Sequence, residues 1–180
     1  IYRIQPDTLE LAVEELVWVT EDAHKGLWGY LLGVDLVKTI SYWNMTADDP
    51  LQWLVDDARR LRRVELDGMW LRVIDVKAAL ESRRYSADGE LIIKINDEFC
   101  PWNEATYRLT VESGKASVVE VGAAADLSLN ADALGAAYLG GVSFSTLEAA
   151  MRVESSSIDR LALADAMFRT ERLPWCPEEI

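Results

Sequence analysis

Residues 88–96, with the sequence DGELIIKIN, are the stretch that decides the fold. The Asp-Gly pair is a typical turn, and aliphatic side chains then stand at positions 91, 93 and 95, which is the spacing of a strand with one buried face. Two similar runs follow at 106–111 and 116–121, and the Ser-Gly pair between them predicts a hairpin. These runs predict a mostly antiparallel sheet at the centre of a domain.

The pattern on either side of this sheet indicates helices. A strand at 68–74 followed by a helix at 76–84 is expected before it, and a short strand at 125–129 after it. Three further helices are expected late in the chain, at 130–139, 145–151 and 157–169. Strands gathered first and helices gathered later predict an α+β fold class.

The first third of the chain has the alternation of strands and helices that is typical of an α/β segment. Strands are expected at 1–6, 10–18 and 34–42, and helices at 20–33 and 51–54. Thr20 is followed by acidic residues, which is typical of a helix N-terminus. We therefore expect two parts, residues 1–65 and 66–180. Because the chain opens in a strand-like run without Met, we also expect it to start inside a longer protein.

The composition excludes several classes of function. Eighteen basic residues against thirty-one acidic ones give a net charge of −13, and a nucleic-acid partner would need a basic face instead. Such a field would attract a cationic small molecule, although an acidic balance can equally serve solubility alone. No apolar run approaches the ~18 residues of a membrane span, so we expect no transmembrane segment.

The potential ligands and nucleophiles are few. Cys100 and Cys176 belong to no paired motif, so we expect reduced thiols in a cytoplasmic protein. His24 is the only histidine, which excludes a multi-histidine zinc site, and we expect no metal. We interpret it as a surface or helix-packing residue. The glycine-containing stretches at 122–124 and 139–142 lack both phosphate-binding motifs, so no nucleotide-binding loop is expected in this chain.

Several longer tracts occur in a distinctive order along nearly the whole chain. They are LW at 27–28, LLGVDLV at 31–37, DPL at 49–51, DGMWLRVIDV at 67–76, AADL at 124–127, LGAAYLGG at 134–141 and AMF at 166–168. Together they resemble the Eis (enhanced intracellular survival) family of acetyltransferases.

This resemblance implies a protein of three parts: an N-terminal GNAT domain that binds acetyl-CoA, a second GNAT-like domain, and a sterol-carrier-protein-like domain. Residues 1–65 would be the end of the second part and residues 66–180 the third. The acetyl-CoA site would lie in the first domain, which is missing from this chain. The resemblance also implies a homo-oligomer, a hexamer in the family, that acetylates amines such as aminoglycosides, polyamines or lysine-type acceptors.

In that family the carboxylate of the last residue acts as the general base, and the role would fall here on Ile180, with Glu179 and Glu178 lining the acceptor cleft. Family members more commonly end in an aromatic residue, so Ile180 keeps the carboxylate but changes the pocket. A frayed tail is the ordinary fate of a chain terminus. Pro174, Trp175 and Pro177 instead favour a docked one.

Alternatives to these roles remain open. Trp102 could line a substrate cleft, although a tryptophan in such a loop more often packs against its own sheet. The chain could also be a module that binds a lipid or another hydrophobic ligand, or a purely structural oligomerisation domain. In every reading the fragment alone is expected to be inactive as an acetyltransferase.

Overall fold

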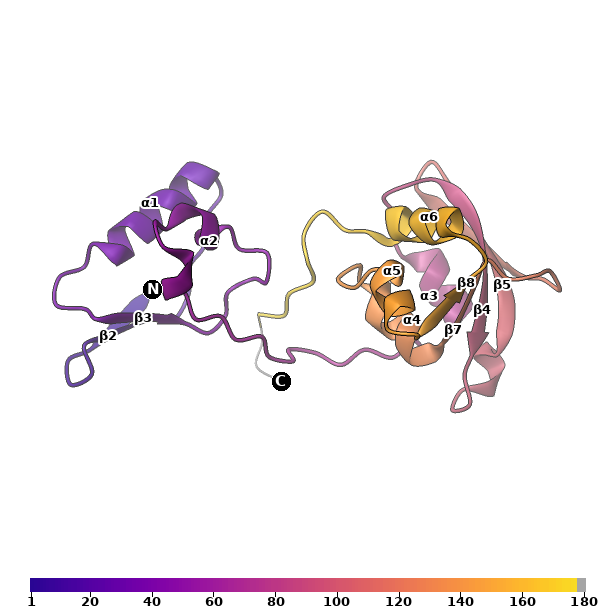
Figure 1. The fold of residues 1–180 in the computed structure, drawn as a ribbon, viewed down its shortest axis with the longest axis horizontal. Coiled ribbons are helices and arrows are strands. Elements are labelled where there is room, and N and C mark those ends of the chain that lie inside the picture. The colour runs from indigo at the N-terminus through magenta and orange to yellow at the C-terminus, as the bar shows by residue number, and fades with distance from the viewer. Residues whose placement is uncertain (178–180) are drawn as a thin grey trace. The chain divides into compact units, whose positions relative to one another are not determined.

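The computed structural model describes residues 1–177 of the 180, and the chain divides into two compact units (Figure 1). Unit 1 contains Ile1–Gly68 together with the end of the chain from Trp175 onward, and unit 2 contains Met69–Pro174. Both units mix helices with sheets, which confirms the predicted α+β class.

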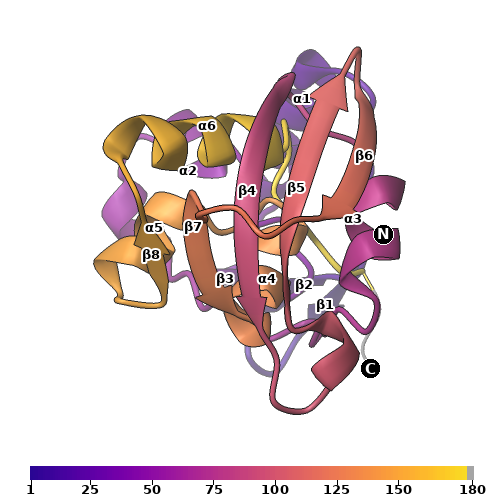
Figure 2. The same cartoon turned by 90° about the vertical axis from the view of Figure 1, so that its right-hand side faces the viewer.

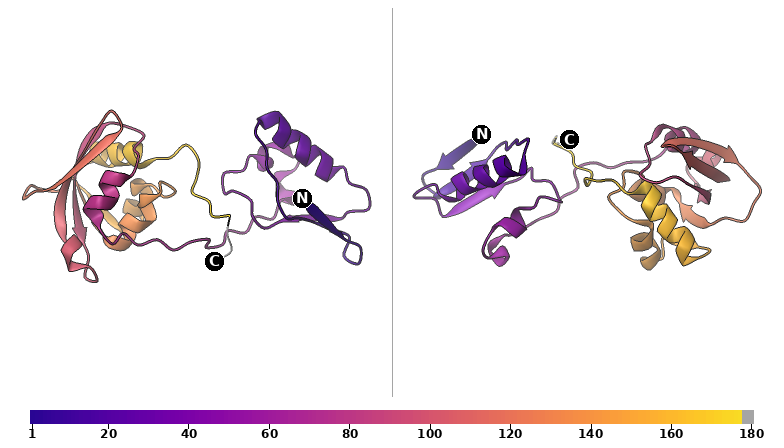
Figure 3. Two further views of the ribbon diagram at one scale, coloured as in Figure 1. Left: turned by 180° about the vertical axis from the view of Figure 1, so that it is seen from behind. Right: turned by 90° about the horizontal axis from the view of Figure 1, so that it is seen from above.

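Unit 1 is built on a three-stranded sheet with the order β1-β2-β3. Its main elements are β1 (Tyr2–Gln5), β2 (Glu10–Val13), α1 (Glu21–Leu32) and β3 (Thr39–Tyr42). Strands β1 and β2 are antiparallel, whereas β2 and β3 are parallel, so α1 is the crossover between the parallel pair (Figures 1 and 3). The short helix α2 (Leu51–Leu54) and a 3₁₀ turn (Ala58–Arg60) follow.

Helix α1 begins where its capping residue predicts. The Thr20 hydroxyl accepts a hydrogen bond from the Ala23 N–H at 3.2 Å. The helix then buries one face against the sheet and α2, and the buried apolar residues of unit 1 are Leu11, Val13, Trp28, Leu31 and Leu51. The predicted strands at 10–18 and 34–42 are too long, because β2 pairs with its neighbours only over Glu10–Val13 and its pairing with β3 begins at Thr39.

Unit 2 is built on a five-stranded sheet with the order β6-β5-β4-β7-β8. Its strands are β4 (Gly89–Asn96), β5 (Ala105–Glu112), β6 (Lys115–Glu120), β7 (Leu127–Asn130) and β8 (Val153–Ser155). All neighbouring pairs are antiparallel except β4 and β7, which are parallel. Strands β4, β5 and β6 form where their alternating patterns predict them. The sequence did not predict β8, since three residues are too few to show an alternation.

The helices of unit 2 lie together on one face of this sheet (Figures 1 and 2). They are α3 (Val76–Ser82), α4 (Ala131–Tyr138), α5 (Phe144–Ala149) and α6 (Ile158–Phe168). Leu91, Ile93 and Ile95 of β4 point into the layer between sheet and helices, and each is fully buried. Burying such a side chain stabilises the fold by about 1.5–3 kcal/mol, so β4 contributes strongly to the core.

The strand predicted at 68–74 does not form, and residues 61–75 have no regular structure. Side chains of the loop after β4 bond this segment instead. The Ile74 carbonyl accepts hydrogen bonds from the Trp102 indole at 2.8 Å and from the Asn103 amide at 3.0 Å, and the Val76 N–H donates to Asn103 Oδ1 at 3.1 Å. The end of this segment is therefore bonded by side chains and not by a neighbouring strand.

Asp97 is the buried charge that holds this loop together. Its Oδ1 accepts from the Cys100 N–H at 2.9 Å, its Oδ2 accepts from the Asn103 amide at 3.1 Å, and Arg72 pairs with it. Burial alone would raise the pKa of this carboxyl, but the Cys100 and Asn103 hydrogen bonds and the Arg72 charge together hold the pKa below its ordinary value. The ionised form is therefore favoured by the fold.

We expect Asp97→Asn to lower the free energy of unfolding of unit 2 by roughly 2–3 kcal/mol at pH 7, because it removes the charge that Arg72 pairs with. A carboxyl with a lowered pKa stabilises the fold above its unfolded pKa of ~3.9, and this contribution is lost as the pH falls through the lower folded value. Urea unfolding should therefore show the difference between the two proteins shrinking below about pH 4. A difference that stays constant down to pH 2 would contradict this account.

Gly140 follows the end of α4 in a backbone conformation that residues with a side chain rarely adopt. Its φ is +81°, and a Cβ there would lie 2.6 Å from the Phe168 carbonyl oxygen. We expect Gly140→Ala to lower the free energy of unfolding by about 2–4 kcal/mol in urea unfolding followed by circular dichroism. Gly122→Ala is the matched control, because nothing lies within 4 Å of its Cβ position. Equal stability of the two variants would show that Gly140 is not constrained.

Candidate functional site

The residues after α6 carry the candidate site, since the proposed catalytic terminus lies at their end. Within unit 2, Pro174 packs closely on Gly141, where a Cβ would lie 2.9 Å from the proline Cδ. Any larger residue at 141 would therefore displace the proline. The absence of a side chain at Gly141 thus leaves the space that Pro174 occupies.

Within unit 1, the side chain of Asn44 binds residues 175–177, which we call the tail segment. The Asn44 Oδ1 accepts a hydrogen bond from the Trp175 indole N–H at 3.0 Å. The Asn44 Nδ2 donates to the Pro177 carbonyl at 3.3 Å. Asn44 follows β3 and is half-buried, and Cys176 lies between the two bonded residues with its Cβ 3.4 Å from where a Cβ of Gly68 would be. The tail segment is therefore attached to unit 1 by specific contacts.

The predicted catalytic residue Ile180 and the predicted cleft residues Glu178 and Glu179 lie outside the described residues. Pro177 is the last described residue before them. The sequence reasoning missed Asn44. No local signal could have found it, because its partners stand 131 and 133 positions further along the chain.

Trp102 lies in the loop after β4, within a 3₁₀ turn at Pro101–Asn103. Its indole N–H is bonded to the Ile74 carbonyl, and its ring is 65% exposed. The hydrogen bond fastens the loop to the segment before α3. Trp102 does not line the pocket described next, so its role as a substrate-binding residue stays a prediction.

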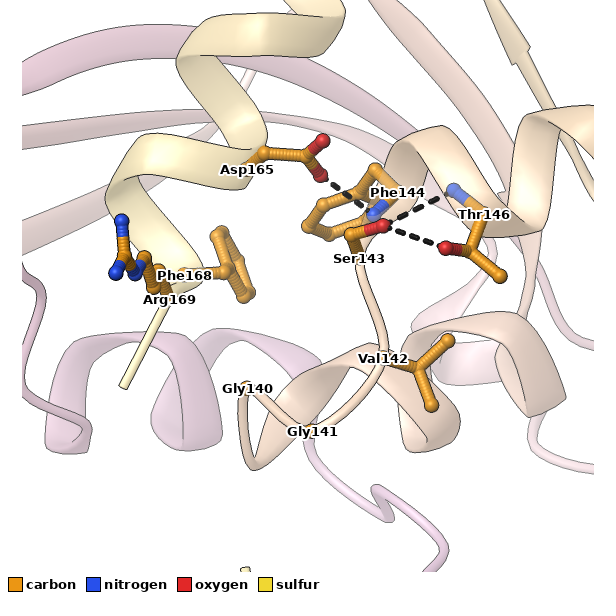
Figure 4. Close-up of a pocket in the computed structure, with 9 residues that line it drawn as sticks. All are labelled: Gly140, Gly141, Val142, Ser143, Phe144, Thr146, Asp165, Phe168 and Arg169. Carbon is orange, nitrogen blue, oxygen red and sulfur yellow. Dashed lines mark hydrogen bonds between the residues drawn. The ribbon is translucent and has the colours of Figure 1, made fainter. Parts of the chain in front are cut away.

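A pocket of about 350 Å³ opens in unit 2 between the end of α4, the start of α5 and the end of α6 (Figure 4). Its lining residues are Gly140, Gly141, Val142, Ser143, Phe144, Thr146, Asp165, Phe168 and Arg169. The acidic and hydroxyl groups in it serve the fold. Asp165 accepts from the Phe144 N–H at 2.6 Å, and Ser143 accepts from the Thr146 N–H at 3.0 Å as the cap of α5. The pocket thus presents no pair of a nucleophile and a base.

His24 and Asp49 form the buried polar pair of unit 1. The histidine Nε2 lies 3.2 Å from Asp49 Oδ2 and 3.1 Å from the Trp28 indole nitrogen, and both side chains are almost completely buried. Asp49 also accepts from the Leu51 N–H at 2.8 Å, which starts α2. The pair therefore links α1 to α2 inside the core, and it is closed to substrates.

The glycines test whether this chain can hold acetyl-CoA. A pyrophosphate cradle needs glycines whose surroundings are open to the ligand. Gly140 and Gly141 instead lie against Phe168, Thr170 and Pro174 of the chain itself. Among the described residues, these glycines therefore do not fit a cofactor cradle.

Within residues 1–177, no group of three His, Cys, Asp or Glu side chains gathers as metal ligands. None of the helices in this part of the chain is long and apolar enough to cross a membrane. Cys100 is buried, Cys176 is partly exposed, and the two form no disulfide.

Each of the two units matches a known protein family. Residues 76–177 match the family described as a sterol carrier protein domain, and residues 1–73 match the one described as an acetyltransferase (GNAT) domain. The N-acetyltransferase Eis of Mycobacterium tuberculosis is 36% identical over 95% of this chain and 42% of its own length. An uncharacterised N-acetyltransferase of Streptomyces avermitilis is 36% identical over 98% of this chain and 44% of its own.

Solved structures agree with these matches. The crystal structure of Eis1 from Mycobacterium abscessus superposes with a TM-score of 0.80 at 35% identity, over 95% of this chain and 43% of that one. A GCN5-related N-acetyltransferase from Kribbella flavida, at 24% identity and a TM-score of 0.72 over 99% of this chain and 45% of that one, shares the fold. This chain spans less than half the length of each of these proteins. It belongs to the family of sterol carrier protein domains over residues 76–177, and over nearly its whole length it is similar to the Eis N-acetyltransferases.

Proposed function

We propose that this chain is the acceptor-side and assembly portion of an acetyl-CoA-dependent N-acetyltransferase that acts on amines. The observation that carries the proposal is the similarity to the Eis N-acetyltransferases over nearly the whole chain, joined to the attachment of the tail segment to the GNAT-like unit. Because the chain spans less than half of its relatives, we place the acetyl-CoA-binding domain in another part of a longer protein. Two cysteines that form no disulfide suit a cytoplasmic enzyme.

The charge of the chain supports a cationic acceptor, such as an aminoglycoside, a polyamine or a lysine-type amine. The net charge of −13 attracts ammonium groups at long range. The last residues, Glu178, Glu179 and Ile180, add two side-chain carboxylates and the terminal one. We propose that the two glutamates line the acceptor cleft and orient the substrate's ammonium groups.

The carboxylate of Ile180 is the proposed general base. A free α-carboxyl has a pKa of about 3.5, which makes it a weak base in water. Burial raises the pKa of such a group, and a fixed position beside the amine compensates for its weakness. The amine nitrogen would bond to the acetyl carbon, its proton would pass to an oxygen of this carboxylate, and the thioester C–S bond would break so that coenzyme A leaves as its thiolate.

Removing Glu179 and Ile180 from the full-length enzyme should lower turnover of an amine substrate about 10²–10⁴-fold, which is the usual contribution of a general base. The deletion moves the terminal carboxylate back to Glu178. A steady-state assay of acetyl transfer measures the effect, and Ile180→Ala is the matched control that keeps the carboxylate in place and should retain most activity. Undiminished turnover after the deletion would contradict the role of the carboxylate.

The chain is also proposed to take part in a homo-oligomer. Trp53 and Trp70 are 82% and 88% exposed, and large aromatic residues of this kind are typical of protein contact surfaces. Light scattering of the purified chain should show a mass that rises with concentration beyond that of a single copy. A monomer at every concentration would count against this part of the proposal.

A further inference from the structure

We propose that Asn44 is a positioning residue that fixes the carboxyl-terminal segment of the chain for the acetyltransferase reaction, an inference that rests on the proposed function. The described contacts of the tail segment point to this one side chain. Its amide bonds the residues on either side of Cys176, at 3.0 Å to the Trp175 indole and at 3.3 Å to the Pro177 carbonyl.

The chemistry of the three groups sets the orientation of the amide. An indole N–H can only donate, and a proline residue offers only its carbonyl as an acceptor. The Asn44 amide carries one group of each kind at a fixed separation. The flipped orientation would lose both bonds, because it would face the indole N–H with an NH₂ group and the carbonyl with an oxygen.

The position of the two bonds matters more than their strength. Pro177 is the last residue before Glu178, so its bond fixes the chain where the three functional residues begin. The rings of Pro174 and Pro177 also lock their own φ angles, which removes part of the freedom of the backbone on both sides of Trp175. A terminus restrained in this way loses less entropy when its carboxylate reaches a substrate.

The tail segment also rests on the backbone of unit 1. The Cys176 Cβ lies 3.4 Å from the position that a Cβ on Gly68 would take, which is ordinary packing distance. Asn44 and Gly68 come from separate parts of unit 1: Asn44 bonds Trp175 and Pro177, and Gly68 lies near Cys176. The attachment is therefore built by the GNAT-like unit and does not depend on the tail segment's own structure.

The experiment uses the full-length enzyme and two variants that keep the shape of the residue. Asn44→Asp retains the acceptor for Trp175 but loses the donor to Pro177, and Trp175→Phe retains an aromatic ring but loses the indole N–H. Each should lower kcat about tenfold, the effect of one lost hydrogen bond, with little change in the melting temperature. Asn130→Asp makes the same amide-to-carboxylate change at an exposed position that forms no hydrogen bond with the tail segment, and it should leave kcat unchanged.

A second arm separates positioning from a general structural effect. In the enzyme that already lacks Glu179 and Ile180, Asn44→Asp should cause no further loss of kcat, because the group it positions is gone. A tenfold loss in both backgrounds would overturn the positioning role while leaving the proposed base intact. Undiminished turnover after the deletion alone would overturn the proposed function, and the role of Asn44 with it. Wild-type kcat in both full-length variants would overturn the inference about Asn44 alone.

Discussion

The buried carboxylate of Asp97 is the constraint on which the organisation of unit 2 depends. It stands at the end of the central strand β4 and is 2% exposed, so each of its oxygens needs a partner. Cys100, Asn103 and Arg72 supply those partners. Asn103 also donates a hydrogen bond to the Ile74 carbonyl and accepts one from the N–H of Val76, the first residue of α3. A single buried charge thus joins the segment that enters the unit to the strand at its centre.

The same rule, that polar groups must find partners, explains the far end of the chain. The tail segment has no helix or strand to satisfy its backbone, and the Asn44 amide bonds it instead. Gly141 gives room to Pro174 within unit 2, and Asn44 holds Trp175 and Pro177 within unit 1. The last described residues are therefore ordered by contacts made elsewhere in the sequence. These contacts are the physical basis for the proposal that the end of the chain takes part in the reaction.

Local patterns predicted the elements that depend on local physics. The alternation at 91–95 gave the central strand, and Thr20 gave the start of α1. The strand predicted at 68–74 does not form, and the end of that segment is bonded at Ile74 by side chains from a loop nearly thirty residues later. Of the two readings of His24, surface or helix packing, the packing one holds, but its partner Asp49 could not be predicted because it lies 25 positions further along the chain. The role of Ile180 came from the family resemblance alone, and the contacts of Asn44 span more than 130 residues, so no periodicity could indicate them.

In the proposed function, the terminal carboxylate takes the proton of the acceptor amine. A semisynthetic full-length enzyme whose last residue ends in an amide would keep the length, the side chains and the Asn44 contacts while removing only that charge. We expect kcat/KM for the amine to fall by at least a hundredfold and the part of its pH dependence due to the carboxylate to disappear. An amidated enzyme with the same kcat/KM and the same pH profile as the unmodified one would contradict it.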